Sequence, residues 1–222
     1  MPRRARIQIP ELSLHVVQRG HDRNDCFFED GDYVAYLDYL ATFAVRFGCS
    51  IHAYCLMTNH VHLFITPRTA QACTQMMRHT SQHYVQRINK RLGRSGTLWE
   101  GRFHSGIVGS ERHALGCYRY IELNPVEAKM VAHPRDYRWS SYEANAGAFS
   151  GFLTPHAAYA ALGVDAPTRG RAYLSLFDVP LERTLIDDIR KATRGGYVVG
   201  TKRKKAGRPR RPVMRKIGSV PD

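Results

Sequence analysis

The sequence lacks three features that would place it in other classes of protein. Its five cysteines are odd in number and none is spaced as CxxC, which argues against a disulfide scaffold or a structural zinc finger. No apolar run reaches the roughly 18 residues that a membrane-spanning helix needs, and the first residues lack the apolar stretch of a signal peptide. We therefore expect a soluble, cytoplasmic protein with no membrane partner.

Acidic residues are also scarce. The 222 residues include 19 Asp and Glu against 33 Lys and Arg, which gives a formal net charge of +14. Such an excess favours a polyanionic partner over a neutral small molecule. With 43% hydrophobic residues, the chain is long enough for one good core and a smaller appendage.

The basic charge gathers at the C-terminal end. Residues 190–222 hold 12 Lys and Arg against one Asp, with much Gly and Pro and few large apolar side chains. We expect residues 193–222 to form a disordered tail that binds DNA, although a merely solvated tail has the same composition. Arg208 and Arg210 flank Pro209 as in the core of an AT-hook, which predicts contacts in a narrow minor groove.

The rest of the chain alternates between the periodicities of strands and helices. Apolar alternation predicts strands, and helical spacing predicts helices that end near Gly48 or begin at Ser110. The order suggests an α+β fold, an antiparallel sheet with helices on one face, over residues 1–148. A small helical appendage that packs on itself should follow at 149–192. The predicted strands are 12–18, 51–57, 60–66 and a segment within 98–108, and the predicted helices are 32–47, 70–92 and 110–124.

Two histidines in the strand at 60–66 are candidate metal ligands. In a strand, side chains at i and i+2 share a face, so His60 and His62 point together while Val61 and Leu63 point into a core. Two adjacent imidazoles can chelate one metal ion. An HxH pattern is more often structural, but here the apolar set already accounts for the buried face. Two ligands rarely hold a catalytic ion, so a third is needed.

The helix that ends before Pro125 offers both a third ligand and a nucleophile. Residues four apart share a helical face, so Tyr120 and Asn124 are neighbours, whereas Tyr118 points about 200° away and should be a core residue. A tyrosine beside a metal-bound phosphate can act as a nucleophile, because the cation polarises the phosphoryl oxygens. Packing and capping are the ordinary alternative for such a pair.

Four segments together resemble one family, the REP-associated tyrosine transposases, which are single-tyrosine HUH transposases. The resemblance begins near the strand that ends in HVVQRG and runs to about Gly147, roughly two thirds of the chain. The segments are MTNHVHLF at 57–64, LWEGRFHS at 98–105, YIELNPVEAKMV at 120–131 and WSSY at 139–142.

The resemblance implies a ferredoxin-like HUH/Rep-type fold and a complete active site. His60 and His62 match the HUH pair, Asn124 the third ligand of Mg²⁺ or Mn²⁺, and Tyr120 the nucleophile. The implied reaction cuts and rejoins single-stranded DNA through a 5′-phosphotyrosine, without a nucleotide cofactor. The implied substrate is a palindromic hairpin with a short flanking recognition sequence, bound by a monomer or a homodimer.

Further DNA contacts are predicted from the residue types alone. Arg19 follows the first strand, and Trp99 and Arg102 lie in a basic, aromatic segment suited to phosphate contact and base stacking. Trp99 and Phe103 are equally suited to a core. Two other functions remain open: a non-catalytic protein that binds palindromic DNA, and a metal-dependent phosphodiesterase in which water replaces Tyr120 as the nucleophile.

Overall fold

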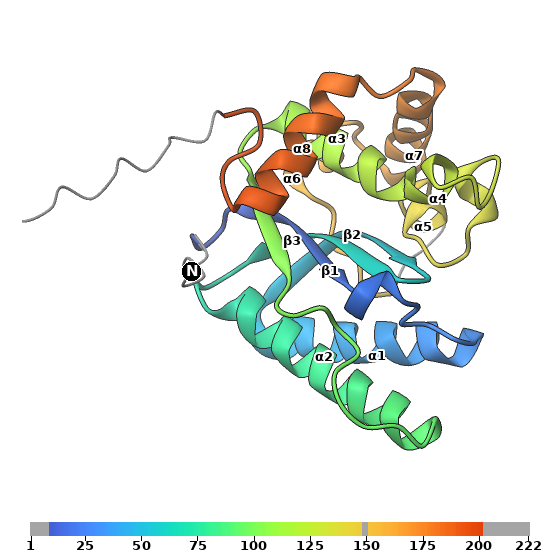
Figure 1. Ribbon diagram of the computed structural model, residues 1–222. Helices are drawn as coiled ribbons and strands as arrows, with labels where there is room; N and C mark the ends of the chain where they lie inside the picture. The colour runs from blue at the N-terminus through green and yellow to red at the C-terminus, as the bar shows by residue number, and fades with distance from the viewer. Residues whose placement is uncertain (1–8, 148–150, 202–222) are drawn as a thin grey trace, which may run out of the picture.

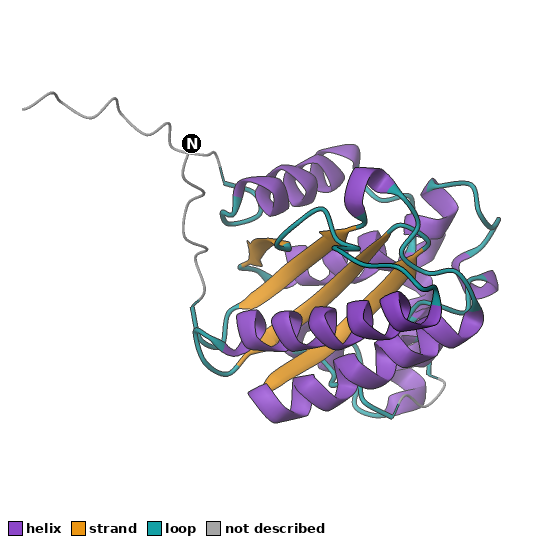
Figure 2. Ribbon diagram, turned by 60° about the horizontal axis from the view of Figure 1, so that its bottom comes forward, coloured by secondary structure: helices purple, strands orange, loops and turns teal. Residues whose placement is uncertain are grey.

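A four-stranded antiparallel sheet forms the centre of the molecule in the computed structural model, which describes residues 9–147 and 151–201 (Figures 1 and 2). The order of the strands is β2-β3-β1-β4. The α+β class and the antiparallel sheet are therefore as predicted. The strands are β1 (Ser13–Arg19), β2 (Cys49–Met57), β3 (His60–Pro67) and β4 (His104–Val108).

Helices cover both faces of this sheet, so the prediction of helices on one face is wrong in that respect. Helices α1 and α2 lie together on one side, and α3 and α8 lie on the other (Figure 1). No helix within the described residues is long and apolar enough to cross a membrane. The helices are α1 (Asp30–Phe47), α2 (Ala72–Arg91), α3 (Glu111–Glu122), α4 (Asn124–Glu127), α5 (Tyr142–Asn145), α6 (Ala157–Ala160), α7 (Ala166–Ser175) and α8 (Arg183–Gly195), with 3-10 turns η1 (His21–Arg23), η2 (Pro134–Asp136) and η3 (Leu176–Asp178).

Helices cover both faces of the sheet because both faces of the strands carry apolar side chains. Val61, Leu63 and Ile65 point towards α1 and α2, as the alternation predicts. Phe64 and Cys55 lie on the opposite face and pack under the second layer of helices. Buried histidines interrupt this second apolar face, which is why it resembles a solvent-facing surface in the sequence.

Local signals set the boundaries of several elements. The Thr58-Asn59 link joins β2 and β3 as a tight hairpin, and Gly48 ends α1 in the left-handed conformation with φ 71°. The Ser110 hydroxyl accepts the backbone N–H of His113 at 3.3 Å and caps α3 as predicted. Only 104–108 of the predicted segment 98–108 forms a strand, because the residues before it turn as a loop through Gly101 at φ 151°.

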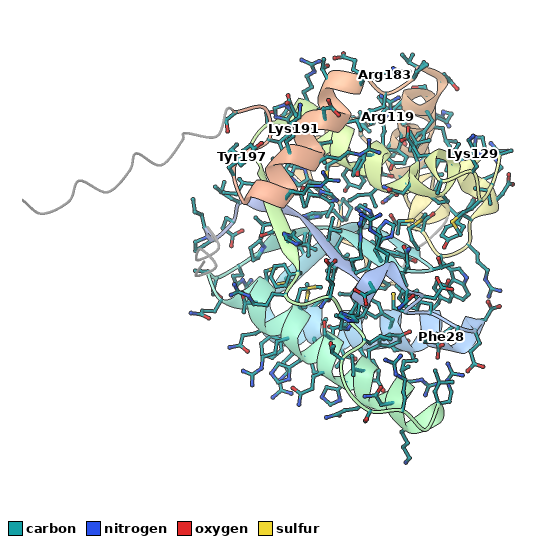
Figure 3. All side chains as sticks on the ribbon, in the orientation of Figure 1. Phe28, Arg119, Lys129, Arg183, Lys191 and Tyr197 are labelled. Atoms are coloured by element: carbon teal, nitrogen blue, oxygen red, sulfur yellow. The ribbon has the colours of Figure 1, made fainter. Side chains whose placement is uncertain are left out.

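The C-terminal segment packs on itself, with the Tyr159 and Tyr173 rings 5.3 Å apart, but it also packs on α3 and the sheet, which was not predicted. The Tyr159 ring lies 5.8 Å from the Tyr118 ring, and Leu185 is buried in the same cluster as Phe64 of the sheet. Helix α8 also runs through the predicted boundary at 192/193, with Lys191 and Arg183 on its surface (Figure 3). The segment after it pairs with β4, because the backbone N–H of Val199 donates to the Ile107 carbonyl at 2.8 Å. The predicted tail contacts at Arg208 and Arg210 lie outside the described residues.

A buried carboxyl group joins α3 to this second layer. Glu122 is 0% exposed and accepts hydrogen bonds from Ser141 at 2.6 Å, Asn145 at 2.8 Å and Tyr173 at 2.5 Å. Burial raises the pKa of Glu122 to about 7, although these three donors oppose the shift. The group therefore bridges α3, α5 and α7.

We expect Glu122→Gln to remove a pH dependence of stability. The folded-state pKa lies above the unfolded value, so the contribution of Glu122 is present in full at acidic pH and is lost as pH rises through about 7. The difference in free energy of unfolding between variant and wild type should therefore shift in favour of the variant between pH 5 and pH 8. Urea titrations at both values measure it, and a difference that does not change with pH would contradict this account.

Candidate active site

A pocket of about 610 Å³ lies between the sheet and helices α3 and α8. His60, His62, Tyr120 and Asn124 all line it, although β3 and the α3–α4 segment that supply them lie far apart in the sequence. The four residues predicted for catalysis and metal binding are thus brought to one place. The pocket is also lined by Arg19, His15, Arg190 and Thr193.

Strand pairing positions the two histidines. In the register of β1 and β3, His60 pairs with Arg19 and His62 pairs with Val17. The two imidazole rings meet edge to face, with their centroids 4.9 Å apart and their planes at 70°. His62 is 4% exposed, whereas His60, the first residue of β3, is only partly buried. Both rings line the same pocket.

The hydrogen bonds of His60 leave one ring nitrogen available. Its Nδ1 lies 2.6 Å from Oδ1 of Asn59, whose amide nitrogen donates to the Arg23 carbonyl at 3.0 Å. Because the amide oxygen only accepts, Nδ1 of His60 carries the proton and Nε2 keeps its lone pair. Burial and the charge of Arg19 lower the pKa of His60 to about 4. A neutral imidazole of this kind is suited to binding a metal ion.

Asn124 fits the part of a third ligand by its chemistry. Its Nδ2 donates to the Tyr120 carbonyl at 2.6 Å and to the Ile121 carbonyl at 3.3 Å, which leaves Oδ1 for another partner. No group of three or more His, Cys, Asp or Glu side chains within 9–147 and 151–201 is arranged to hold a metal ion. Two imidazole nitrogens and an amide oxygen form a donor set that Mn²⁺ accepts and Mg²⁺ tolerates.

Tyr120 lies over the histidines, with its hydroxyl next to the guanidinium of Arg190. Its ring centroid is 5.7 Å from that of His62, and its hydroxyl accepts a hydrogen bond from Nε of Arg190 at 3.3 Å. Burial raises the pKa of Tyr120, while the hydrogen bond and charge of Arg190 oppose that rise. Arg190 is itself held by Glu127 at 3.2 Å. Arg190 thus favours the phenolate form, which is the stronger nucleophile.

The neighbouring tyrosine on α3 has a different place. Tyr118 is fully buried, and its hydroxyl accepts the backbone N–H of His156 at 3.2 Å. It therefore belongs to the core, as the helical spacing predicts. The two tyrosines form a natural pair of test and control positions.

His15, Arg190 and Thr193 are among the pocket residues that were not predicted from the sequence. Nε2 of His15 lies 2.9 Å from Nδ1 of His62, and Nδ1 of His15 lies 2.7 Å from the Thr193 hydroxyl. The strand alternation already places His15 on the face opposite Leu14, and this signal could have found it. No local pattern could have found Arg190 or Thr193, because α8 reaches the site only through tertiary packing.

The residues predicted to contact DNA have different positions. Arg19 is the last residue of β1 and lies in the pocket beside His60, where its charge suits a phosphate. Arg102 is exposed beside a second hollow, between α2 and the loop 97–103. Trp99 is 4% exposed and packs in the core about 6 Å from Tyr84, so the core alternative describes it better.

We expect removal of the Arg190 guanidinium to raise the pKa of Tyr120, because both the hydrogen bond and the positive charge disappear. Arg190→Met should show the rise by NMR of protein labelled at the tyrosine ζ carbon, with Tyr120→Phe to assign the signal. Arg190→Lys keeps the charge and should give a smaller rise. An unchanged Tyr120 titration in Arg190→Met would contradict the role assigned to this arginine.

Comparison with solved structures shows a similar fold. A solved REP-associated tyrosine transposase bound to a REP hairpin is 16% identical and has a TM-score of 0.57, with 71% of this chain and 96% of that chain covered. This likeness concerns the fold. A structure from Deinococcus radiodurans R1, provisionally described as a transposase, is 18% identical over 51% of this chain and 91% of its own, with a TM-score of 0.38. No curated protein matches the sequence significantly.

A family model gives the assignment. The model for IS200-like transposases matches residues 8–124, which is more than half of the chain. The match includes β1 and β3, both histidines, Tyr120 and Asn124. It ends before α8, which supplies Arg190 and Thr193. The chain belongs to the family of IS200-like transposases.

Proposed function

We propose that this protein is a DNA transposase that cuts and rejoins single-stranded DNA at palindromic hairpins, with Tyr120 as its nucleophile. The observation that carries the proposal is the meeting of Tyr120, His60, His62 and Asn124 in one pocket. A core tyrosine such as Tyr118 has no access to such a group of ligands. The pocket thus has both a nucleophile and a set of metal donors.

The reaction that suits this pocket is a transesterification. The Tyr120 oxygen attacks the scissile phosphorus, the bond to the 3′ oxygen breaks, and the products are a 5′-phosphotyrosine and a free 3′-OH. The phenol proton leaves to solvent, and the departing 3′ oxygen takes up a proton. Rejoining is the reverse attack by another 3′-OH, so the bond energy stays in the tyrosine linkage and no nucleotide cofactor is needed.

The side chains of the pocket divide the remaining tasks. His60, His62 and Asn124 would hold a divalent cation, which supplies the charge that polarises the phosphate oxygens. Arg190 holds the Tyr120 hydroxyl and lowers the cost of forming the phenolate. Arg19, at the end of β1, is placed to pair with a phosphate next to the scissile one.

The proposed substrate rests on the relatives and on charge. The fold resembles that of a REP-associated tyrosine transposase that was solved with a REP hairpin. The net charge of +14 and the basic residues beyond Thr201 suit the binding of a folded DNA strand. We therefore propose single-stranded DNA hairpins as the substrate.

The first test removes one hydroxyl group. The substrate is a labelled single-stranded DNA hairpin taken from the sequence beside the gene for this protein. In the presence of Mn²⁺ or Mg²⁺, the wild-type protein should form a covalent protein–DNA adduct that survives a denaturing gel. Tyr120→Phe should form none and should keep DNA affinity within about twofold. Tyr118→Phe removes a hydroxyl from the core side of the same helix and should still form the adduct, at a cost of about 1 kcal/mol in stability.

Two outcomes would contradict the proposal and favour a specific alternative. Strand cleavage that leaves unmodified 5′ ends would indicate a phosphodiesterase that uses water. Tight hairpin binding with no cleavage in either metal would indicate a non-catalytic DNA-binding protein.

The second test removes the basic tail. A stop after Thr201 deletes nine Lys and Arg but keeps the pairing of Val199 with Ile107, which a stop after Arg194 would destroy. Binding should weaken, and the slope of log K against log salt should fall by about 0.7 for each phosphate that the protein no longer neutralises. A variant with the same nine residues changed to Gln is the matched control. Unchanged affinity at low salt would rule out a role of the tail in binding.

A further inference from the structure

A chain of buried hydrogen bonds connects His62 to helix α8. Nδ1 of His62 lies 2.9 Å from Nε2 of His15, whose Nδ1 lies 2.7 Å from the Thr193 hydroxyl. We propose that His15 and Thr193 are positioning residues that hold His62 in the tautomer with its proton on Nδ1, so that Nε2 presents a lone pair to the divalent cation. This inference rests on the proposed function only in assuming that His62 binds a cation.

The direction of each hydrogen bond follows from Thr193, the last residue of this hydrogen-bonded series. The Thr193 hydroxyl donates its one hydrogen to the Ile189 carbonyl at 2.8 Å, so towards His15 it can only accept. His15 therefore carries its proton on Nδ1. His15 is 1% exposed, and a second proton would place a positive charge on this buried ring at a large cost in desolvation, so Nδ1 carries the one proton. Its Nε2 is an acceptor, and Nδ1 of His62 must donate to it.

Both histidines of the HxH motif are therefore held in the same tautomer, each by a different hydrogen-bond partner. Asn59 accepts a hydrogen bond from Nδ1–H of His60, and His15 accepts one from Nδ1–H of His62. Both rings keep Nε2 unprotonated and available in the pocket. Outer partners of this kind fix the ring orientation of metal-binding histidines and raise their basicity.

The fold makes room for this contact at one glycine. Gly106 of β4 pairs with His15, and a Cβ atom there would lie 2.9 Å from the backbone nitrogen of Thr193 and 3.0 Å from the Ala192 carbonyl carbon. Only glycine lets α8 approach the sheet closely enough for the Thr193 hydroxyl to reach His15. The close approach of α8 is independent evidence that the contact is a specific feature of this structure.

The experiment compares two threonines. Thr66 also bonds a buried histidine of the same sheet, with its hydroxyl 2.7 Å from Nε2 of His52, but this hydroxyl donates, because Nδ1 of His52 donates to the Thr154 carbonyl. Thr193→Val and Thr66→Val therefore each remove a hydroxyl from a buried histidine, but only Thr193→Val removes the acceptor of His15. Without the Thr193 acceptor, His15 should move its proton to Nε2 and donate to His62, which would place the His62 proton on Nε2.

Two readouts follow this change without DNA. In metal-free wild type and Thr66→Val, imidazole ¹⁵N NMR should show His62 protonated on Nδ1, and in Thr193→Val on Nε2. Titration of free Mn²⁺ by electron paramagnetic resonance should show about 10-fold to 100-fold weaker binding in Thr193→Val than in Thr66→Val. His15→Phe should weaken Mn²⁺ binding similarly, and thermal melts establish that each variant is folded.

Three results would overturn the inference: a wild-type His62 protonated on Nε2, a wild type that binds no Mn²⁺, or a folded Thr193→Val that binds Mn²⁺ as well as Thr66→Val does. These results are separate from those that test the proposed function. A protein that shows the expected tautomers and Mn²⁺ affinities but forms no DNA adduct would refute the transposase chemistry and leave the positioning role intact.

Discussion

Buried imidazoles lie on the face of the sheet that α3 and α8 cover, and they constrain how this layer of helices packs. An unpaired polar group costs free energy when it is removed from water, so a buried ring nitrogen that does not face the pocket needs a partner. His52 meets this need through Thr66 and the Thr154 carbonyl, and His15 through His62 and Thr193. The helices and segments that cover the sheet are therefore fixed by polar contacts as well as by apolar packing.

The same contacts make the C-terminal segment part of the candidate active site. Strand β3 supplies the two histidines and α3 supplies the tyrosine, but the group that hydrogen-bonds the tyrosine comes from Arg190 on α8. The family model ends at residue 124, before this helix begins. Glu122 ties α3 to α5 and α7, so the tyrosine-bearing helix is held by the appendage on a second side. The appendage thus positions side chains of the candidate active site, which it could not do as a separate unit.

Some of this could be predicted from the sequence, because it depends on local periodicity. Alternation along β3 separates His62 from Leu63, and helical spacing separates Tyr120 from Tyr118. The burial of the second face could not be predicted, because its histidines have the residue type of a solvated surface. The placement of Arg190 against Tyr120 joins positions 70 residues apart and leaves no periodic signal. Trp99 shows the opposite limit, since an aromatic residue among arginines fits a core and a base-stacking site equally well.

The most direct test of the central claim is the position of a bound metal ion. Crystals of Tyr120→Phe grown with Mn²⁺ allow the ion to be located by anomalous scattering, without turnover of DNA. One Mn²⁺ is expected within coordination distance of Nε2 of His60, Nε2 of His62 and Oδ1 of Asn124. An ion bound through an Nδ1 atom, or a pocket in which Mn²⁺ contacts neither histidine, would contradict it.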